Sequence, residues 1–313
     1  MKLLRLSLFL FFILHFISCS NDDDVDETQT TTPENQVADI KISSVTKTKF
    51  SDPESDESFE YDTYRAITKS EVIDNKFGSS TTTRYGDDVI LSEETNVNFS
   101  YNEKGLLTSG NNQFYFYDDS DRLIAVESRT NDNTAVLIYA RIKYDSNEIR
   151  IEIHNKSHLE SDSTIKRMSI LTLDENNNIT KALLDDRNDG TIDRSNTFIY
   201  DDNNNLVQAT NLITGVVKNY EYSSVLDTEE FLLNNSFGKL NRTILAGEAI
   251  SYITILSTSS QFHFEKVPRT NALISTEYTY SDIEESGYYK VSRFDQMINC
   301  CDEFHITAEY FFD

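Results

Sequence analysis

The sequence predicts an all-β, mainly antiparallel protein, with repeated hairpins in one continuous twisted sheet and at most one or two short helices. Three observations support this fold class. Short runs of alternating apolar and polar residues recur between clusters of Asp, Asn and Gly, and long helical patterns are missing. The chain has 17 Tyr and 19 Phe, and aromatic residues are enriched in strands and depleted in disordered chains. One strand–turn–strand element also recurs along the chain.

The first 18 residues have the features of a secretory signal. Lys2 and Arg5 give a positive start, and an almost wholly apolar run follows from 6 to 17. This run is shorter than the roughly 20 apolar residues that span a bilayer as a helix. The small residue Ser18 ends the run and directly precedes Cys19. We therefore expect cleavage between these two residues.

The segment Phe16-Ile17-Ser18-Cys19 resembles the lipobox of bacterial lipoproteins, with Phe and Ser in place of the common Leu and Gly. The resemblance implies that Cys19 becomes the new N-terminus and carries acyl chains, which would supply the contact with the outer membrane. The alternative is an ordinary secretory signal followed by a chance cysteine.

An acidic run, Asn21-Asp22-Asp23-Asp24, comes almost directly after Cys19. It is similar to the export tag of surface-exposed lipoproteins in Bacteroidota, which implies an outer-membrane lipoprotein that faces the cell exterior. A periplasm-facing lipoprotein is the alternative. Residues 19–36 are mostly Asp, Glu, Thr, Asn and Gln, and such a stretch cannot bury enough apolar surface to fold. We expect a disordered acidic stalk there.

The net charge limits the classes of partner. The whole chain carries −25, and loss of Lys2 and Arg5 with the signal would leave −27. An anionic surface is repelled by phosphate backbones and by anionic lipid headgroups, so nucleic acid is excluded as an expected partner and the membrane contact is expected from the acyl chains. A glycan or a protein remains as the ligand class.

The repeated element has four full copies that share the same spacing. Each has an apolar residue, an aromatic or Leu anchor two positions later, and then Asp or Asn. A Gly, Asp or Asn stands four positions after the anchor, and an apolar residue stands six positions after it. The anchors are Tyr101, Tyr117, Leu173 and Tyr200. The fourth positions are Gly105, Asp121, Asn177 and Asn204, and the sixth are Leu107, Leu123, Ile179 and Leu206. A looser copy, one residue shorter, spans 142–149.

This spacing predicts a hairpin in each copy. Residues two positions apart lie on one face of a strand. The Asp or Asn after the anchor can cap its own turn, and Gly, Asp and Asn tolerate the left-handed backbone of a short loop with a bulge. The alternative is a series of unrelated hairpins in a generic sheet.

The segment Tyr117-Asp118-Asp119-Ser120-Asp121-Arg122-Leu123 resembles the YD repeat of the RHS family, Tyr-Asp-x-x-Gly-Arg-Leu, with Asp in place of Gly. The resemblance covers about residues 97–225, with a further unit at 278–282. It implies successive antiparallel hairpins in a continuing twisted sheet. Large family members wind many units around a toxin, but the five or six units here are too few to enclose a cargo.

The predicted organisation has four parts. A lipoprotein signal peptide occupies 1–18, and the lipidated cysteine and stalk occupy 19–36. The hairpin repeat region covers 37–225, and a β-rich C-terminal region that continues the same sheet covers 226–313.

The flanks of the repeats are less regular. Alternating stretches within 37–96 predict strands that open the same sheet, and 306–310 predicts a terminal strand that protects one edge. Residues 227–245 predict a short helix capped by Asp227 and weakened by Gly238.

Residues 185–196 resemble a calcium loop of the EF-hand type, with Gly190 at the turn. Its ligands would be Asp185, Asp189, Asp193 and the carbonyl of Thr191. However, Arg187 replaces a third ligand, and Asn196 stands where a bidentate Glu belongs. The alternative, an Asp/Asn-rich turn without metal, agrees better with these departures, and we expect no other cofactor.

The remaining candidates are isolated. Cys300 and Cys301 are adjacent and lack the second pair that a zinc site needs. His154 and His158 are four residues apart without the Glu of a His-Glu-x-x-His motif, which predicts two exposed loop histidines. No nucleophile motif or phosphate-binding loop is present, so we expect no enzymatic activity.

These patterns predict a non-catalytic surface scaffold for binding or structure. The alternatives are an accessory glycan-binding lipoprotein with exposed tyrosines and an extracellular hydrolase. A flat row of exposed aromatics would favour glycan binding, and a deep pocket with shifted carboxylates would favour catalysis. Buried tyrosines would favour the scaffold.

Overall fold

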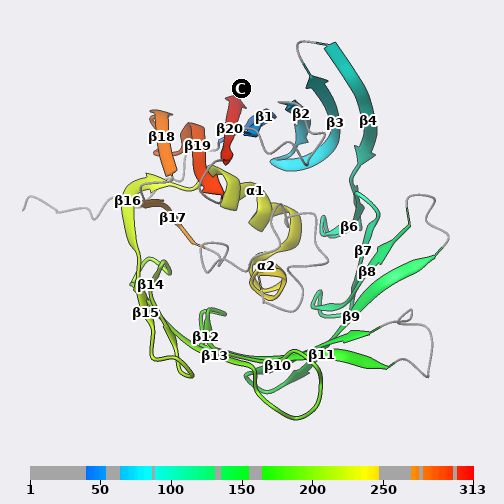
Figure 1. Cartoon of the computed structure of the whole chain (residues 1–313), viewed down its shortest axis with the longest axis vertical. Coiled ribbons are helices and arrows are strands. Elements are labelled where there is room, and N and C mark those ends of the chain that lie inside the picture. The colour runs from blue at the N-terminus through cyan, green and yellow to red at the C-terminus, as the bar shows by residue number, and fades with distance from the viewer. Residues whose placement is uncertain are drawn as a thin grey trace, which may run out of the picture. The chain divides into compact units, whose positions relative to one another are not determined.

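A computed structural model describes residues 40–53, 64–86, 89–130, 135–154, 164–246, 269–274, 278–298 and 302–313. The chain divides into Met1–Val37 and Ala38–Asp313, and every described residue belongs to the second unit. The described part consists of two large antiparallel sheets, a two-stranded sheet and two helices (Figure 1). The all-β fold class is confirmed. The predicted signal, Cys19 and the stalk lie outside the described residues.

The repeats form an eleven-stranded sheet, here called the repeat sheet, in the order β15 to β5. Its strands are β5 (Ser100–Tyr101), β6 (Leu107–Gly110), β7 (Gln113–Tyr117), β8 (Leu123–Arg129), β9 (Val136–Asp145), β10 (Glu148–His154), β11 (Ile165–Leu173), β12 (Ile179–Asp185), β13 (Arg194–Tyr200), β14 (Leu206–Asn211) and β15 (Val217–Asn219). Strands adjacent in sequence are adjacent in the sheet, so each connection is a hairpin, as the spacing predicts.

The turns of the four full copies have the predicted geometry. The residue four positions after each anchor has a left-handed φ of 79° (Gly105), 64° (Asp121), 63° (Asn177) or 61° (Asn204). The Asn or Asp directly after each anchor accepts two backbone N–H groups through its Oδ1 atom in every copy, at 2.8–3.1 Å. The apolar residue that opens each return strand is at most 3% exposed. Each copy is therefore a capped hairpin.

Three tyrosines of the repeat sheet region join successive hairpins. Tyr117 donates its hydroxyl hydrogen to the Leu107 carbonyl at 2.7 Å, and Tyr144 donates to the Leu123 carbonyl at 2.8 Å. Tyr222, after the last full copy, donates in the same way to Leu206 at 2.9 Å. Each acceptor belongs to the apolar residue that opens the return strand of the preceding hairpin. The phenol thus satisfies a backbone carbonyl beside the core.

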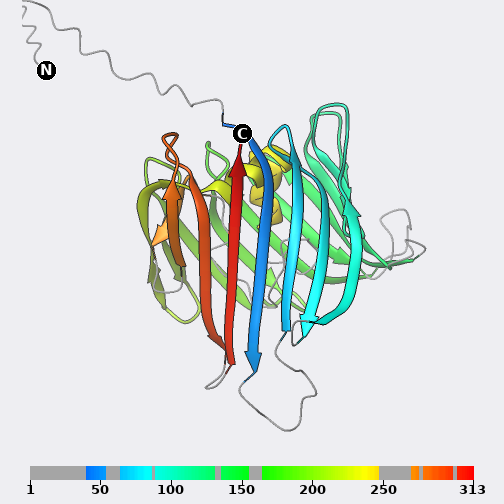
Figure 2. The same cartoon turned by 90° about the horizontal axis from the view of Figure 1, so that it is seen from above.

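The strands outside the repeats form a second sheet, here called the terminal sheet, in the order β18-β19-β20-β1-β2-β3-β4. They are β1 (Ile42–Pro53), β2 (Tyr64–Ile73), β3 (Lys76–Gly86), β4 (Val89–Asn98), β18 (Tyr278–Ile283), β19 (Tyr289–Ile298) and β20 (Asp302–Phe312). Figure 2 shows β20 beside β1. The predicted terminal strand therefore lies inside this sheet and not at an edge, and the strands before residue 99 pair with the C-terminal strands instead of opening the repeat sheet.

The further unit expected near 278–282 has its turn a few residues later. Between β18 and β19, Glu284 N donates to the Tyr288 carbonyl and Gly287 N donates to the Glu284 carbonyl, both at 2.9 Å. Asp118 and Asp121 make the same pair of backbone bonds in the second repeat, and Gly287 has a φ of 88°. The backbone of this turn matches the repeats although Glu replaces Asp.

The predicted helix is present as two short helices, α1 (Thr228–Phe237) and α2 (Lys239–Leu245), separated by Gly238 at φ 77°. Asp227 caps α1 by accepting the Glu230 N–H. The helices lie between the two large sheets (Figure 1), and β16 (Glu221–Leu226) with β17 (Asn271–Ile274) completes the strands. Within the described ranges, neither helix has the length and apolar character needed to cross a bilayer.

The helices contribute to both hydrophobic cores. Phe237 and Ile244 pack in the core of the repeat sheet, and Leu232 packs in the core of the terminal sheet. Asn241 of α2 fixes the second repeat turn, since its Oδ1 accepts Leu123 N at 2.8 Å and its Nδ2 donates to the Asp121 carbonyl at 3.0 Å. The helix pair is therefore a structural element common to both sheets.

The contribution of a turn cap to the free energy of unfolding can be measured by removing one cap. Asp201 accepts the N–H groups of Asn203 and Asn205 at 2.9 and 2.8 Å, and it also accepts the Asn205 side-chain amide. We expect Asp201→Ala to lower the free energy of unfolding by about 1–2 kcal/mol in urea titration. The neighbouring Asp202 is exposed, so Asp202→Ala should stay within about 0.5 kcal/mol of the wild type. Equal losses in both variants would contradict a capping role.

Candidate functional site

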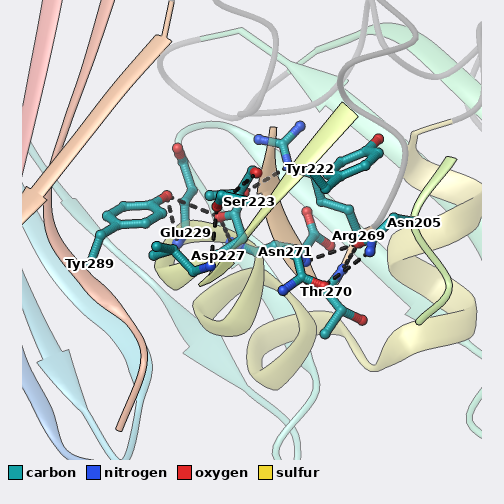
Figure 3. Close-up of polar contacts among 12 residues, drawn as sticks. Asn205, Tyr222, Ser223, Asp227, Glu229, Arg269, Thr270, Asn271 and Tyr289 are labelled. Atoms are coloured by element: carbon teal, nitrogen blue, oxygen red, sulfur yellow. Dashed lines mark hydrogen bonds and ion pairs between the residues drawn. The ribbon is translucent and has the colours of Figure 1, made fainter. Parts of the chain in front are cut away.

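A group of buried polar contacts surrounds Asp227, where the chain enters α1 (Figure 3). Asp227 is 2% exposed. Its Oδ1 accepts the Glu230 N–H at 3.0 Å and the Tyr289 hydroxyl at 2.9 Å, while its Oδ2 accepts Arg269 Nε at 2.7 Å. A buried carboxylate needs such donors because desolvation penalises its charge. These residues come from α1, from β19 and from the segment just before β17, so Asp227 joins three separate segments.

The last full repeat contributes to the same network (Figure 3). Asn205 is buried, and its Oδ1 accepts the N–H groups of Thr270 and Asn271 at 3.0 and 2.9 Å. Its Nδ2 donates to the Asn271 side chain at 3.0 Å and to Asp201 at 3.0 Å. One amide therefore couples the cap of a repeat turn to the segment that carries Arg269.

The terminal sheet is tied to α1 by neighbouring contacts. Thr228 donates its hydroxyl hydrogen to the Tyr289 carbonyl at 2.6 Å, and Lys47 of β1 forms an ion pair with Glu229. Burial, reinforced by the negative charge of Asp227, raises the pKa of Tyr289 well above its usual value, so this phenol stays protonated as a donor.

A second buried ion pair joins the two helices. Arg242 of α2 contacts Glu230 of α1 at 2.8 Å, with side chains only 5% and 7% exposed. Burial raises the pKa of Glu230 from 4.5 to about 7; Arg242 opposes this shift, and Asp227 adds to it. Glu230 Oε1 and Asn234 Oδ1, one helical turn apart, have no hydrogen-bond partner in the structure. A proton on Glu230 Oε1 would change this atom from an acceptor without a donor into a donor.

Asp227, Arg269 and Tyr289 are here called the clamp, because their contacts hold separate segments of the chain together. The donors of Arg269 and Tyr289 are directed at Asp227, which leaves that carboxylate engaged by the protein itself. Across the part of the chain that the structure describes, no three His, Cys, Asp or Glu side chains are grouped so that they could hold a metal ion. The arrangement holds the helices between the sheets.

The predicted calcium loop is the turn between β12 and β13. Asp185 accepts the N–H groups of Asp189 and Gly190 at 3.1 and 2.8 Å. Asp193 accepts Asp186 N at 2.8 Å and the Arg187 guanidinium at 3.3 Å, and Asp189 accepts Thr191 N at 2.9 Å. The three carboxylates are thus in one turn, where they accept bonds from the turn itself, as in the metal-free alternative. Calcium binding here stays a prediction.

His154 differs from its predicted place in an exposed loop. It ends β10, is 2% exposed, and stacks on Tyr139 with 4.5 Å between ring centroids. Its Nε2 lies 3.4 Å from Glu152. The prediction of an exposed histidine was wrong because pairing with β9 extends the strand up to this residue. His158, Cys300 and Cys301 lie outside the described residues.

A group of charged side chains around Glu152 on β10 was not predicted from the sequence. This carboxylate is 2% exposed and contacts Lys143 at 2.8 Å and Arg150 at 2.9 Å. Burial would raise the pKa of Glu152, but the hydrogen bond and charge of Lys143, with Arg150, lower it overall. The alternation of Glu148, Arg150, Glu152 and His154 was the available signal. It indicates cross-strand pairs on one sheet face.

Comparisons with known proteins give no family assignment. No protein-family model matches the chain, and no curated protein matches it. A porin-like protein from Bacteroides uniformis is similar over 87% of this chain and 96% of that chain, with 10% identity and a TM-score of 0.38. A Photorhabdus luminescens Tc holotoxin pore structure is similar over 81% of this chain but only 12% of that chain, with 15% identity and a TM-score of 0.27. These TM-scores do not establish a shared fold.

Proposed function

We propose that this chain is a lipid-anchored cell-surface protein whose body is a non-catalytic β-scaffold for binding or structure. The scaffold part of this proposal rests on one observation: the polar side chains of the repeats form hydrogen bonds within the protein itself. The turn carboxylates and amides cap their own hairpins, and Tyr117, Tyr144 and Tyr222 bond to backbone carbonyls. The anchor part rests on the sequence around Cys19.

Glycan binding, the first alternative, has less support. Stacking of sugars needs exposed aromatic faces, yet Phe311 is the sole exposed aromatic among the side chains that the structure describes. The tyrosines of the repeats are at least partly buried, which favours a scaffold. A binding site for another ligand would have to use residues other than a row of exposed rings.

Hydrolase activity, the second alternative, would need an accessible carboxyl group with a shifted pKa. Glu230 has a pKa raised to about 7, but it is buried in an ion pair with Arg242. Asp227 accepts three donors from the protein itself. The contacts of both carboxylates thus favour a structural role.

Metabolic labelling with a palmitate analogue tests the anchor. We expect the wild type to incorporate the label and to sediment with membranes, and Cys19→Ser to lose both properties. Cys301→Ser is the matched control and should keep the label. Protease added to intact cells should degrade the labelled protein if it faces the exterior and spare it if it faces the periplasm. An unlabelled wild type would contradict the proposal.

A further inference from the structure

The hairpin between β14 and β15 exposes a group of aliphatic side chains at the edge of the repeat sheet. Leu212, Ile213, Val216 and Val217 are 52%, 57%, 55% and 49% exposed. Turns at the surface normally carry Gly, Pro, Asn, Asp or Ser. By comparison, the described turn between β12 and β13 exposes one large aliphatic side chain, Ile192. Four large aliphatic residues at one tip therefore require a specific explanation.

The tip is held in a defined conformation. Asn211 Oδ1 accepts the N–H groups of Ile213 and Thr214, both at 3.0 Å. Asn211 N donates to the Val216 carbonyl, and Gly215 N donates to the Asn211 carbonyl, both at 2.8 Å. Leu212 N also donates to Ser195 of β13 at 2.7 Å. The aliphatic side chains are thus presented by a turn whose backbone bonds are already made.

The charge around the tip differs from that of the whole chain. No ionisable residue lies between Leu212 and Val217, whereas the chain as a whole carries −25. The exposed Lys218 follows directly, and the exposed Arg194 begins β13 beside Ser195. An uncharged aliphatic tip next to one lysine suits a zwitterionic lipid surface. The aliphatic groups can enter the interface and Lys218 can meet a headgroup phosphate, while the anionic body is not repelled by a net lipid charge.

We propose that the tip Leu212–Val217 inserts into a zwitterionic phospholipid surface, with Lys218 at the headgroup phosphates. A protein partner fits less well, because an ordinary interface buries about 800 Å² per partner and this feature is one turn. A second copy of the chain is opposed by the mutual repulsion of two strongly anionic bodies. The inference builds on the proposed function, since an acylated Cys19 would keep the tip near a membrane.

The chain has no tryptophan, so one introduced indole reports its own position. Ile213→Trp places it at the tip. Ile73→Trp is the matched control, because Ile73 is 54% exposed and lies at the β2–β3 turn. Both full-length variants are mixed with phosphatidylcholine vesicles, with and without phosphatidylglycerol, and quenched by lipids brominated on the acyl chains. We expect a blue shift and several-fold stronger quenching for Ile213→Trp, smaller with phosphatidylglycerol, which repels the anionic body, and reduced by Lys218→Glu.

Two results would overturn the inference. Equal emission and quenching for the two tryptophan positions would show that the tip does not enter the lipid. A blue shift that grows with protein concentration in the absence of vesicles would assign the tip to a second copy. Palmitate labelling reports on Cys19, and tryptophan emission and quenching report on the tip. Failure of the lipid anchor and failure of tip insertion are therefore detected by different measurements.

Discussion

Replacement of Asp227 by asparagine is expected to lower the free energy of unfolding by about 3–5 kcal/mol. The amide oxygen can still accept the Glu230 N–H and the Tyr289 hydroxyl, so the main change is the lost negative charge. That charge lies 2.7 Å from the guanidinium of Arg269, whose side chain is 14% exposed. A buried cation without its carboxylate is strongly destabilising, and a domain has only about 5–15 kcal/mol in total. Urea titration followed by far-UV circular dichroism measures the loss.

Two further variants make this expectation decisive. Asp202→Asn removes one carboxylate from an exposed position and should leave the urea midpoint nearly unchanged. Tyr289→Phe removes the hydroxyl that donates to Asp227 and accepts the Glu229 N–H, and it should cost about 1–2 kcal/mol, which keeps the test readable if Asp227→Asn fails to fold. A wild-type midpoint for Asp227→Asn would show that the clamp does not stabilise the fold.

The hairpin repeats were predictable because their signals are local. The cap, the left-handed residue and the returning apolar residue all lie within seven positions of one another, as in Tyr117 to Leu123. The helix start at Asp227 and the break at Gly238 are local signals of the same kind. Backbone sterics and side-chain capping act over a few residues, so the sequence alone carries this information.

The pairing of the terminal sheet was not predictable in that way. β20 pairs with β1, so Val45 lies opposite Tyr310, and an alternating strand pattern does not specify its partner across such a separation. The clamp could not be predicted from the sequence for the same reason. Asp227 was identified only as a helix cap, and its contacts with Arg269 and Tyr289 depend on how distant segments pack.

The stability of the protein should depend on pH through Glu230. The pKa of this carboxyl is raised from 4.5 to about 7 in the folded state. The folded protein therefore holds a proton that the unfolded chain releases near pH 4.5, and this contribution is lost as pH rises towards 7. We expect wild-type stability relative to Glu230→Gln to fall by about 2–3 kcal/mol between pH 5 and pH 8. Urea titrations of both proteins at the two pH values give this difference.

Between pH 5 and pH 8, the difference in stability between the wild type and Glu230→Gln can be assigned to Glu230. The pKa values of Asp118, Glu152 and Asp189 are lowered, so these carboxylates stay ionised throughout. Every other ionisable group is common to both proteins, so its contribution cancels in the comparison. The exposed Glu221 gives the control variant Glu221→Gln, which should track the wild type at both pH values. If Glu230→Gln also tracks the wild type, Glu230 is ionised throughout, and the unpartnered oxygens of Glu230 and Asn234 need another donor.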